Sequence, residues 1–177
     1  MEAAPKRNIE LKAWLASLEA AAAVAQRLAT NHLGVQRQTD TYFHCRHGRL
    51  KLREIDGQAA QLIWYQRPDQ SGPKASDYRL TAVAEPEALK QTLAAACGVL
   101  VVVGKRREIY LYENVRIHLD EVAGLGTFLE FEAVLSDGQD DAAGHCQLAW
   151  LSEQFGLGKA DLLGGSYSDL LLAQIES

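Results

Sequence analysis

Asn8-Ile9-Glu10-Leu11-Lys12 near the start of the chain and Phe128-Leu129-Glu130-Phe131-Glu132 near its end alternate between polar and apolar side chains. Successive side chains of a β-strand point to opposite faces of the sheet. As a strand, the first stretch places Glu10 and Lys12 on one face, and the second does the same for its two glutamates. Both stretches are therefore predicted to be strands that bring carboxylates to the polar face of a sheet.

The bulk properties indicate one folded domain over residues 1–177. The chain is 47 % hydrophobic, which is enough for a core and excludes wholesale disorder. No apolar run approaches the roughly 20 residues of a membrane-spanning helix, and no secretory signal is visible at the N-terminus. Cys45, Cys97 and Cys146 are scattered, unlike a disulfide framework or a metal knuckle. A cytoplasmic protein with reduced thiols is expected.

The formal net charge of −5 argues against a general nucleic-acid-binding protein. Phosphate contacts with nucleic acid usually need a basic surface. A local basic pocket is still compatible with this charge, because a pocket depends on how charges are distributed and not on their sum. No nucleic-acid or membrane partner is therefore expected.

Turn residues and hydrophobic periodicity predict eight strands and four helices. Ser17 is the predicted N-cap of the first helix, and Asp56-Gly57 is the strongest hairpin signal. Hairpin-linked strands with helices at intervals are typical of an α+β fold, an antiparallel sheet or barrel with helices outside. The predicted strands are 7–15, 35–46, 49–55, 59–67, 76–83, 99–112, 115–122 and 127–135, the predicted helices are 18–32, 87–97, 140–155 and 167–175, and the C-terminal helical region starts at about 138.

Lys and Arg side chains gather on the polar faces of these predicted strands. Lys51 shares a face with Arg53, and Lys105 shares one with Arg107. Together the polar faces carry Lys12, Lys51, Arg53, Arg67, Lys105, Arg107 and Arg116, along with Glu10, Asp120, Glu130 and Glu132.

Two arrangements fit these charged faces. In an ordinary solvated sheet they point outward. Solvated faces usually also contain Thr, Ser and Gln, so the enrichment in Arg and Lys within an acidic protein favours charged faces that meet across a lumen. Clustered cations need counter-charge, which a triphosphate with about four negative charges would supply. The carboxylates would then hold Mg²⁺ or Mn²⁺, hard ions that prefer oxygen ligands.

Six motifs in this order resemble the CYTH family, the triphosphate tunnel metalloenzymes, which include class IV adenylyl cyclases and thiamine triphosphatases. The resemblance covers about residues 6–135 and, more loosely, the segment from Ser166 to the end. It implies an eight-stranded antiparallel β tunnel, in agreement with the number of predicted strands. The motifs are Asn8–Lys12, Gly48–Arg53, Arg67–Asp69, Gly72–Lys74, Arg116–Asp120 and Phe128–Glu132.

The resemblance implies a role for most of the charged residues. It makes Glu10, Glu130 and Glu132 the ligands of Mg²⁺ or Mn²⁺. It makes Lys12, Arg53, Lys74, Lys105, Arg107 and Arg116 contacts of the phosphates. The polar faces add Lys51 and Arg67 to this substrate-binding set, and His118 is expected to donate or accept a hydrogen bond in the lumen.

The chain departs from the family at one position of the opening motif. This motif is usually Glu-x-Glu-x-Lys, and Asn8 stands here in place of the first Glu. An amide oxygen can ligate a metal or position a water, but it supplies no charge. The number of bound metal ions is therefore left open.

Two reactions fit such a tunnel, and a third alternative is binding without turnover. A cyclase directs the ribose 3′-hydroxyl at the α-phosphate, whereas a triphosphatase directs water at the terminal phosphate. The motifs Arg67–Asp69 and Gly72–Lys74 favour the class IV adenylyl cyclase branch, so cyclisation of ATP to cyclic AMP and pyrophosphate is the leading expectation. Hydrolysis of inorganic, nucleoside or thiamine triphosphate is the second, and a non-catalytic triphosphate-binding module is the third.

Three groups are alternatives for the acceptor of the nucleophile's proton: Asp120, Tyr42 and a metal-bound hydroxide. In the simplest structural alternative Asp120 only pairs with a neighbouring Arg. The sequence also leaves open whether the C-terminal helices plug one mouth of the tunnel or make the contact of a homodimer.

Overall fold

The computed structural model describes residues 5–136 and 140–176. The predicted order of eight strands and four helices is confirmed, and a 3-10 turn and a two-residue strand lie between the last two helices. The predicted start of the C-terminal helical region at about residue 138 lies outside the described residues, as do both ends of the range 1–177. The strands are β1 (Lys6–Trp14), β2 (Asn31–Phe43), β3 (Arg49–Ile55), β4 (Ala60–Gln66), β5 (Lys74–Val83), β6 (Val99–Tyr112), β7 (Val115–Val122), β8 (Gly126–Val134) and β9 (Leu162–Leu163). The helices are α1 (Leu18–Leu28), α2 (Pro86–Cys97), α3 (Asp141–Gln154), a 3-10 turn at Lys159–Asp161 and α4 (Tyr167–Ile175).

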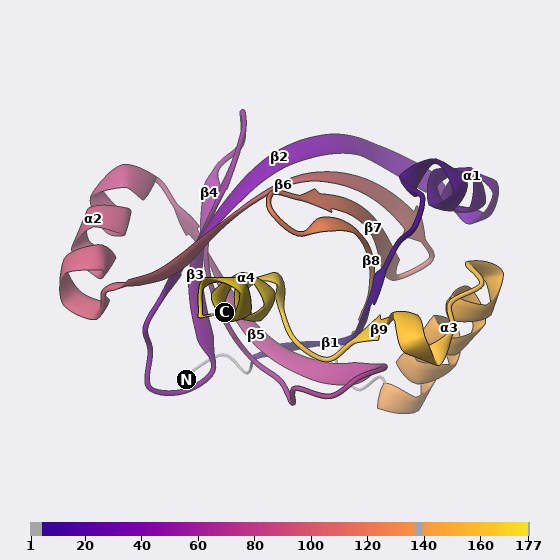
Figure 1. Cartoon of the computed structure of the whole chain (residues 1–177). Helices are drawn as coiled ribbons and strands as arrows, with labels where there is room; N and C mark the ends of the chain where they lie inside the picture. The colour runs from indigo at the N-terminus through magenta and orange to yellow at the C-terminus, as the bar shows by residue number, and fades with distance from the viewer. Residues whose placement is uncertain (1–4, 137–139, 177) are drawn as a thin grey trace.

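Strands β1 to β8 form a closed antiparallel barrel (Figure 1). Hydrogen bonding runs in the order β5-β4-β3-β2-β6-β7-β8-β1, and β1 pairs with β5 to close the ring. Beyond Lys74, the first residue of β5, the short strand β9 continues along β1 by pairing with Lys12 and Ala13. The predicted eight-stranded barrel is confirmed.

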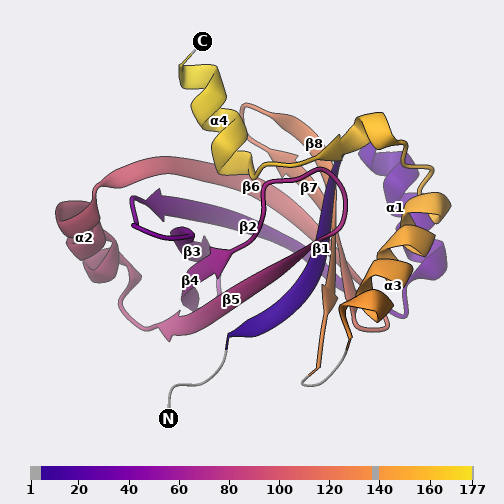
Figure 2. The ribbon, with the colours of Figure 1, turned by 90° about the horizontal axis from the view of Figure 1, so that it is seen from below.

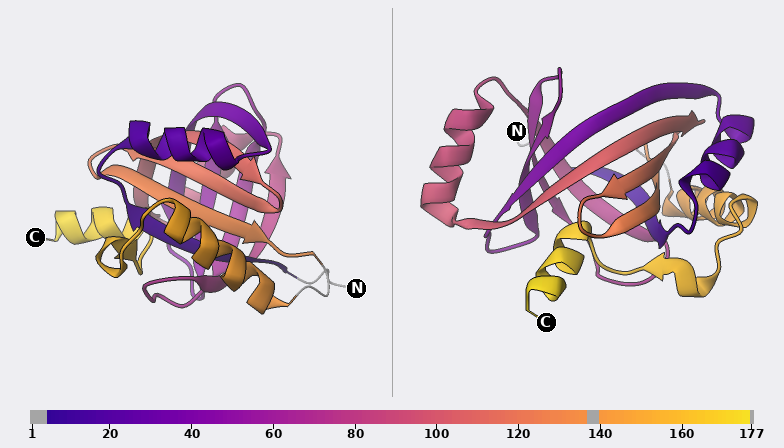
Figure 3. Two further views of the ribbon diagram at one scale, coloured as in Figure 1. Left: turned by 90° about the vertical axis from the view of Figure 1, so that its right-hand side faces the viewer. Right: turned by 45° about the horizontal axis from the view of Figure 1, so that its top comes forward.

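The apolar faces of β1, β7 and β8 point outward and are covered by α1 and α3 (Figure 3). Ile9 of β1 and Phe131 of β8 are fully buried together with Ala25 of α1 and Leu148 of α3. Gly144 brings α3 close to the barrel, because a Cβ at this position would lie 2.7 Å from Cγ1 of Ile9. This packing explains why the charged faces of the same strands point inward.

Helix α2 packs at the opposite end of the molecule from α1 and α3 (Figure 1). Its Leu89 and Leu93 lie against Phe43 of β2 and Leu52 of β3. No helix in the described part of the chain has the length and apolar character needed to cross a membrane.

Helix α4 lies at one mouth of the barrel, in front of the opening in Figure 1 and projecting from the same side in Figure 2. Tyr167, its first residue, is buried against Phe128 at the start of β8. Arg49 of β3 forms ion pairs with Asp69 of the β4–β5 loop and with Asp169 of α4, both at 2.8 Å. Helix α4 therefore lies where a plug of this mouth would lie, and the contact of a homodimer stays a prediction.

The first helix and the strand after it differ from the prediction. Ser17 caps α1 as expected, since its side chain accepts a hydrogen bond from a backbone N–H at 3.1 Å. However, α1 ends at Leu28 and not at about His32, because β2 already begins at Asn31 and pairs with β6. Gly34, with φ of +86°, accommodates the register shift next to His32. The long ladder of backbone hydrogen bonds outweighs the local helix pattern.

Leu148→Ala tests the packing of α3 on the barrel. The side chain is fully buried, so its loss should lower the free energy of unfolding by about 2–5 kcal/mol. Leu33→Ala is the matched control, because Leu33 on β2 is 52 % exposed and its truncation should cost less than about 0.5 kcal/mol. Chemical denaturation of both variants gives the comparison, and equal losses would contradict this account of the core.

Candidate functional site

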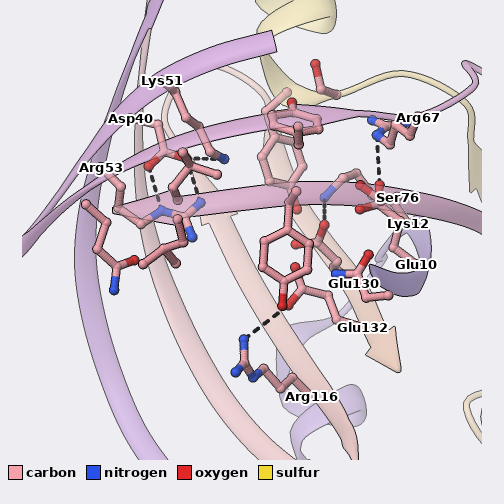
Figure 4. Close-up of a pocket in the computed structure, with 18 of the residues that line it drawn as sticks. Glu10, Lys12, Asp40, Lys51, Arg53, Arg67, Ser76, Arg116, Glu130 and Glu132 are labelled. Carbon is pink, nitrogen blue, oxygen red and sulfur yellow. Dashed lines mark hydrogen bonds and ion pairs between the residues drawn. The ribbon is translucent and has the colours of Figure 1, made fainter. Parts of the chain in front are cut away.

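A cavity of about 240 Å³ occupies the barrel, and all eight strands contribute side chains to it (Figure 4). Among the described residues that line it, the cations are Lys12, Lys51, Arg53, Arg67, Lys105, Arg107 and Arg116, and the carboxylates are Glu10, Asp40, Glu130 and Glu132. Seven cations face four carboxylates, and Asp120 behind Arg107 is a fifth. A formal excess of two positive charges remains.

Glu130 of β8 has a cation against each of its two carboxylate oxygens. It lies directly opposite Lys12 in the register of β1 and β8, with Nζ at 2.9 Å from Oε1. Arg107 contacts its other oxygen at 2.6 Å, and Nδ1 of His118 lies 3.4 Å from the same atom. Burial alone would raise the pKa of Glu130, but Lys12 and Arg107 outweigh burial and hold it well below its usual range. Glu130 is therefore ionised.

Glu10 and Glu132 are paired less completely. They are direct register partners on β1 and β8, so two carboxylates face one another. Nε of Arg67 lies 2.8 Å from Glu10, whereas Arg116 approaches Glu132 only to 3.7 Å. Burial, with the charges of Glu130 and Glu132, raises the pKa of Glu10 despite Arg67. This pair is the part of the cavity with the greatest need for a further cation.

Asp40 of β2 organises the opposite wall, although it is not among the site residues predicted from the sequence. Three cations converge on its carboxylate: Lys51 at 2.9 Å, Arg53 at 2.7 Å and Lys105 at 2.8 Å. Strand alternation could have identified Asp40, because it lies two residues before Tyr42 and therefore shares a strand face with it. Burial alone would raise the pKa of Asp40, but these cations hold it well below its usual range.

Tyr42 and Asp120, the two residues predicted to accept a proton, occupy different environments. Tyr42 lines the cavity, and its hydroxyl accepts a hydrogen bond from Lys51 at 3.3 Å. Burial raises the pKa of its phenol above the usual range. Asp120 is fully buried behind the cavity wall, where it accepts hydrogen bonds from Arg107 and from the hydroxyl of Tyr167. Although burial opposes ionisation, Arg107 lowers the pKa of Asp120 to about 2.

Lys74 and His118 are not among the described residues that line the cavity. Nζ of Lys74 donates hydrogen bonds to the backbone carbonyls of Gln70, Leu163 and Gly164 at 2.8–3.2 Å. It thus joins the β4–β5 loop to the segment before α4. Burial lowers the pKa of Lys74 to about 8.

The plug also reaches into the cavity. Tyr167 of α4 lines it, and Nζ of Lys12 lies 3.8 Å from the centre of its ring. A cation over an aromatic face is attracted by the ring quadrupole. Tyr167 was not selected from the sequence, because only the fold brings the C-terminal region to the lumen.

Comparison with known proteins agrees with this geometry. The profile of the CYTH domain matches residues 6–167. The chain belongs to the CYTH family. Its members act on triphosphates and are generally metal-dependent. A search of the curated proteins found no match.

Solved structures similar to this CYTH protein show the same fold. The PH1012 protein from Pyrococcus horikoshii OT3 is 24 % identical, with a TM-score of 0.81, over 92 % of this chain and 98 % of that chain. A candidate adenylate cyclase from Vibrio parahaemolyticus is 22 % identical, with a TM-score of 0.80, over 95 % and 99 %. HpAC1 from Hippeastrum, a candidate adenylyl cyclase described as having a dominant triphosphatase activity, is 16 % identical, with a TM-score of 0.66, over 96 % of each chain.

The residues of this CYTH tunnel fit a hard divalent cation. Glu10, Glu130 and Glu132 offer carboxylate oxygens, and Oδ1 of Asn8 is buried without a hydrogen-bond partner in the described part of the chain. His118, Glu130 and Glu132 each place one ligand atom within 4.8 Å of the others. Oxygen-rich sites of this kind suit Mg²⁺ and Mn²⁺.

The affinity of the tunnel for inorganic triphosphate should fall as pH rises through 7. Burial, together with Arg53 and Arg107, lowers the pKa of Lys105 to about 7 despite Asp40, so Lys105 is charged below this pH and neutral above it. Lys105→Arg keeps the charge throughout. Calorimetric titration with triphosphate in EDTA should show wild-type affinity falling relative to Lys105→Arg, by up to about tenfold between pH 6 and 8. Parallel pH profiles would refute this role of Lys105.

Proposed function

We propose that this protein is a metal-dependent enzyme that binds a nucleoside triphosphate with its phosphate chain in the tunnel and cyclises ATP to cyclic AMP and pyrophosphate. The observation that supports an anionic substrate is the excess of cations over carboxylates in the cavity. Buried cations are costly unless an opposite charge compensates them. Four of the cations are arginines, whose planar groups suit bidentate contact with phosphate.

The end of the cavity near Arg116 favours a nucleoside triphosphate over a bare phosphate chain. Tyr78 of β5 lies close enough to Arg116 for the charge of Arg116 to act on its phenol, and Leu80 of β5 lines the cavity directly opposite Ile63 of β4. Arg116 and Leu80 are also partly open to solvent. The volume of about 240 Å³ is below the roughly 300–1,000 Å³ of sites that enclose a drug-sized ligand. The phosphate chain would fill the lumen, and the nucleoside would contact this apolar wall.

Cyclisation forms a bond between the 3′-oxygen and the α-phosphorus and breaks the bond from that phosphorus to the oxygen shared with the β-phosphate. The hydroxyl proton passes to water in the cavity and ends on the pyrophosphate, which leaves with the electron pair. A divalent ion on the carboxylates would supply Lewis-acid polarisation of the phosphate oxygens. Arg53 of β3 with Lys105 and Arg107 of β6 would stabilise the charge that develops on pyrophosphate.

In this mechanism Asp120 and Tyr42 are positioning residues. Asp120 is ionised, but both of its oxygens accept hydrogen bonds from Arg107, and one of them also from Tyr167. It therefore fixes the direction of the Arg107 guanidinium. Tyr42 keeps its proton, because its pKa is raised, and its hydroxyl holds Lys51.

Hydrolysis of a triphosphate is the second candidate activity. The same cations would stabilise either leaving group, so the cavity charge supports both reactions. The fold shared with HpAC1 from Hippeastrum, which is described as having a dominant triphosphatase activity, favours keeping this alternative.

Product analysis separates the candidates. Purified protein incubated with ATP and either Mg²⁺ or Mn²⁺ should release cyclic AMP and pyrophosphate in equal amounts, with no reaction in EDTA. Chromatography of the nucleotides together with a pyrophosphate assay measures both products. ADP and phosphate without cyclic AMP would replace the cyclase by a triphosphatase, and saturable ATP binding without any product would indicate a binding module.

Glu132→Gln tests the carboxylate that is least engaged by cations. Turnover with Mg²⁺ should fall by about a hundredfold or more, because a metal ligand is lost. In EDTA the same variant should melt at an equal or higher temperature, since the repulsion between Glu10 and Glu132 is removed. Glu121→Gln is the matched control, because Glu121 of β7 is exposed. Wild-type turnover of Glu132→Gln would exclude Glu132 as a metal ligand.

A further inference from the structure

Asn8 has the one buried side-chain oxygen of the cavity wall that lacks a hydrogen-bond partner, within the part of the chain that the structure describes. The residue is 6 % exposed and lines the cavity on β1. Leaving such an acceptor unpaired inside a protein is costly, because the oxygen has lost its hydrogen bonds to water. A metal ion or a hydrogen-bond donor that binds this oxygen in the cavity would remove the cost.

The carboxylates next to Asn8 need a cation more than any others in the barrel. Glu10, two residues along the same strand face, lies directly opposite Glu132. The other charged register pairs of the lumen are complementary, as Lys12 with Glu130 and Arg107 with Asp120 show. Like charges directly opposite one another destabilise a sheet.

The charge of the cavity indicates how many divalent ions it accepts. Its formal excess is two positive charges when Asp120 is included. A nucleoside triphosphate carries about four negative charges. One divalent ion reduces this to about two, which matches the excess, whereas a second ion would leave two positive charges without partners. The neutral amide of Asn8 keeps the number of carboxylates consistent with a single ion.

We propose that this tunnel holds one divalent metal ion, bound by Glu10 and Glu132, with Oδ1 of Asn8 as a neutral third oxygen ligand. Asn8 thereby sets both the position and the number of metal ions. The inference rests on the proposed function only in assuming that a divalent ion enters the tunnel. It assigns Glu130 mainly to Lys12 and Arg107, which already contact both of its oxygens.

Counting Mn²⁺ on the protein without nucleotide tests the proposal separately from turnover. Electron paramagnetic resonance distinguishes free from bound Mn²⁺, so titration of the metal-free full chain gives stoichiometry and affinity. We expect one Mn²⁺ per chain for the wild type. Asn8→Ala should weaken its binding by about tenfold or more, and Asn8→Asp, which keeps an oxygen in place and adds a charge, should tighten it.

Gln38→Ala is the matched control. Gln38 is also a buried amide with an unpartnered side-chain oxygen, but it does not line the tunnel cavity as described. This variant should bind Mn²⁺ like the wild type, and thermal melting of each variant confirms that it is folded.

Two tightly bound Mn²⁺ ions on the wild type, or unchanged affinity in folded Asn8→Ala, would overturn the proposal. So would a wild type that binds no Mn²⁺. If two ions bind while the protein still turns over ATP with metal, the single-ion assignment fails and the proposed function stands. If one ion binds as expected but no product forms, the metal site stands and the proposed function fails.

Discussion

The ion pairs inside the barrel, above all those of Arg107 with Asp120 and Glu130, are the interactions on which the rest of the structure depends. Ions withdrawn from water are costly unless an opposite charge lies against them. The register of the sheet supplies this pairing, because Arg107 lies directly opposite Asp120, Lys12 opposite Glu130 and Asp40 opposite Arg53. Each pair links neighbouring strands, so the same contacts that make the lumen polar also hold its wall in register.

Much of the barrel could be predicted from the sequence because strand alternation is a local property. The faces of Glu10 and Lys12, or of Glu130 and Glu132, follow from their spacing alone. The end of α1 was misplaced because the competing ladder between β2 and β6 joins distant residues. Strand β9 escaped prediction for a related reason, since a two-residue strand has no period and exists only through its pairing with β1.

The candidate site was predictable in its charges but not in their partners. Lys51, Arg53 and Lys105 were assigned to the lumen, yet the sequence did not show that Asp40 joins them. Lys74 was assigned to phosphate, whereas its ammonium group contacts three backbone carbonyls near the plug. Every residue has a backbone carbonyl, so residue types do not predict which carbonyls will bind a lysine. Such a contact can be identified only in the folded chain.

Closure of the barrel has a consequence for how the chain is made. The first strand, β1, pairs with β5, and also with β8 and β9, which lie near the other end of the sequence. Pairing between such distant segments is slow to form. On the ribosome, β1 therefore emerges long before β8, and one of its edges stays unpaired until β8 has been made. During this time, chaperone binding or faulty association with another nascent chain competes with folding.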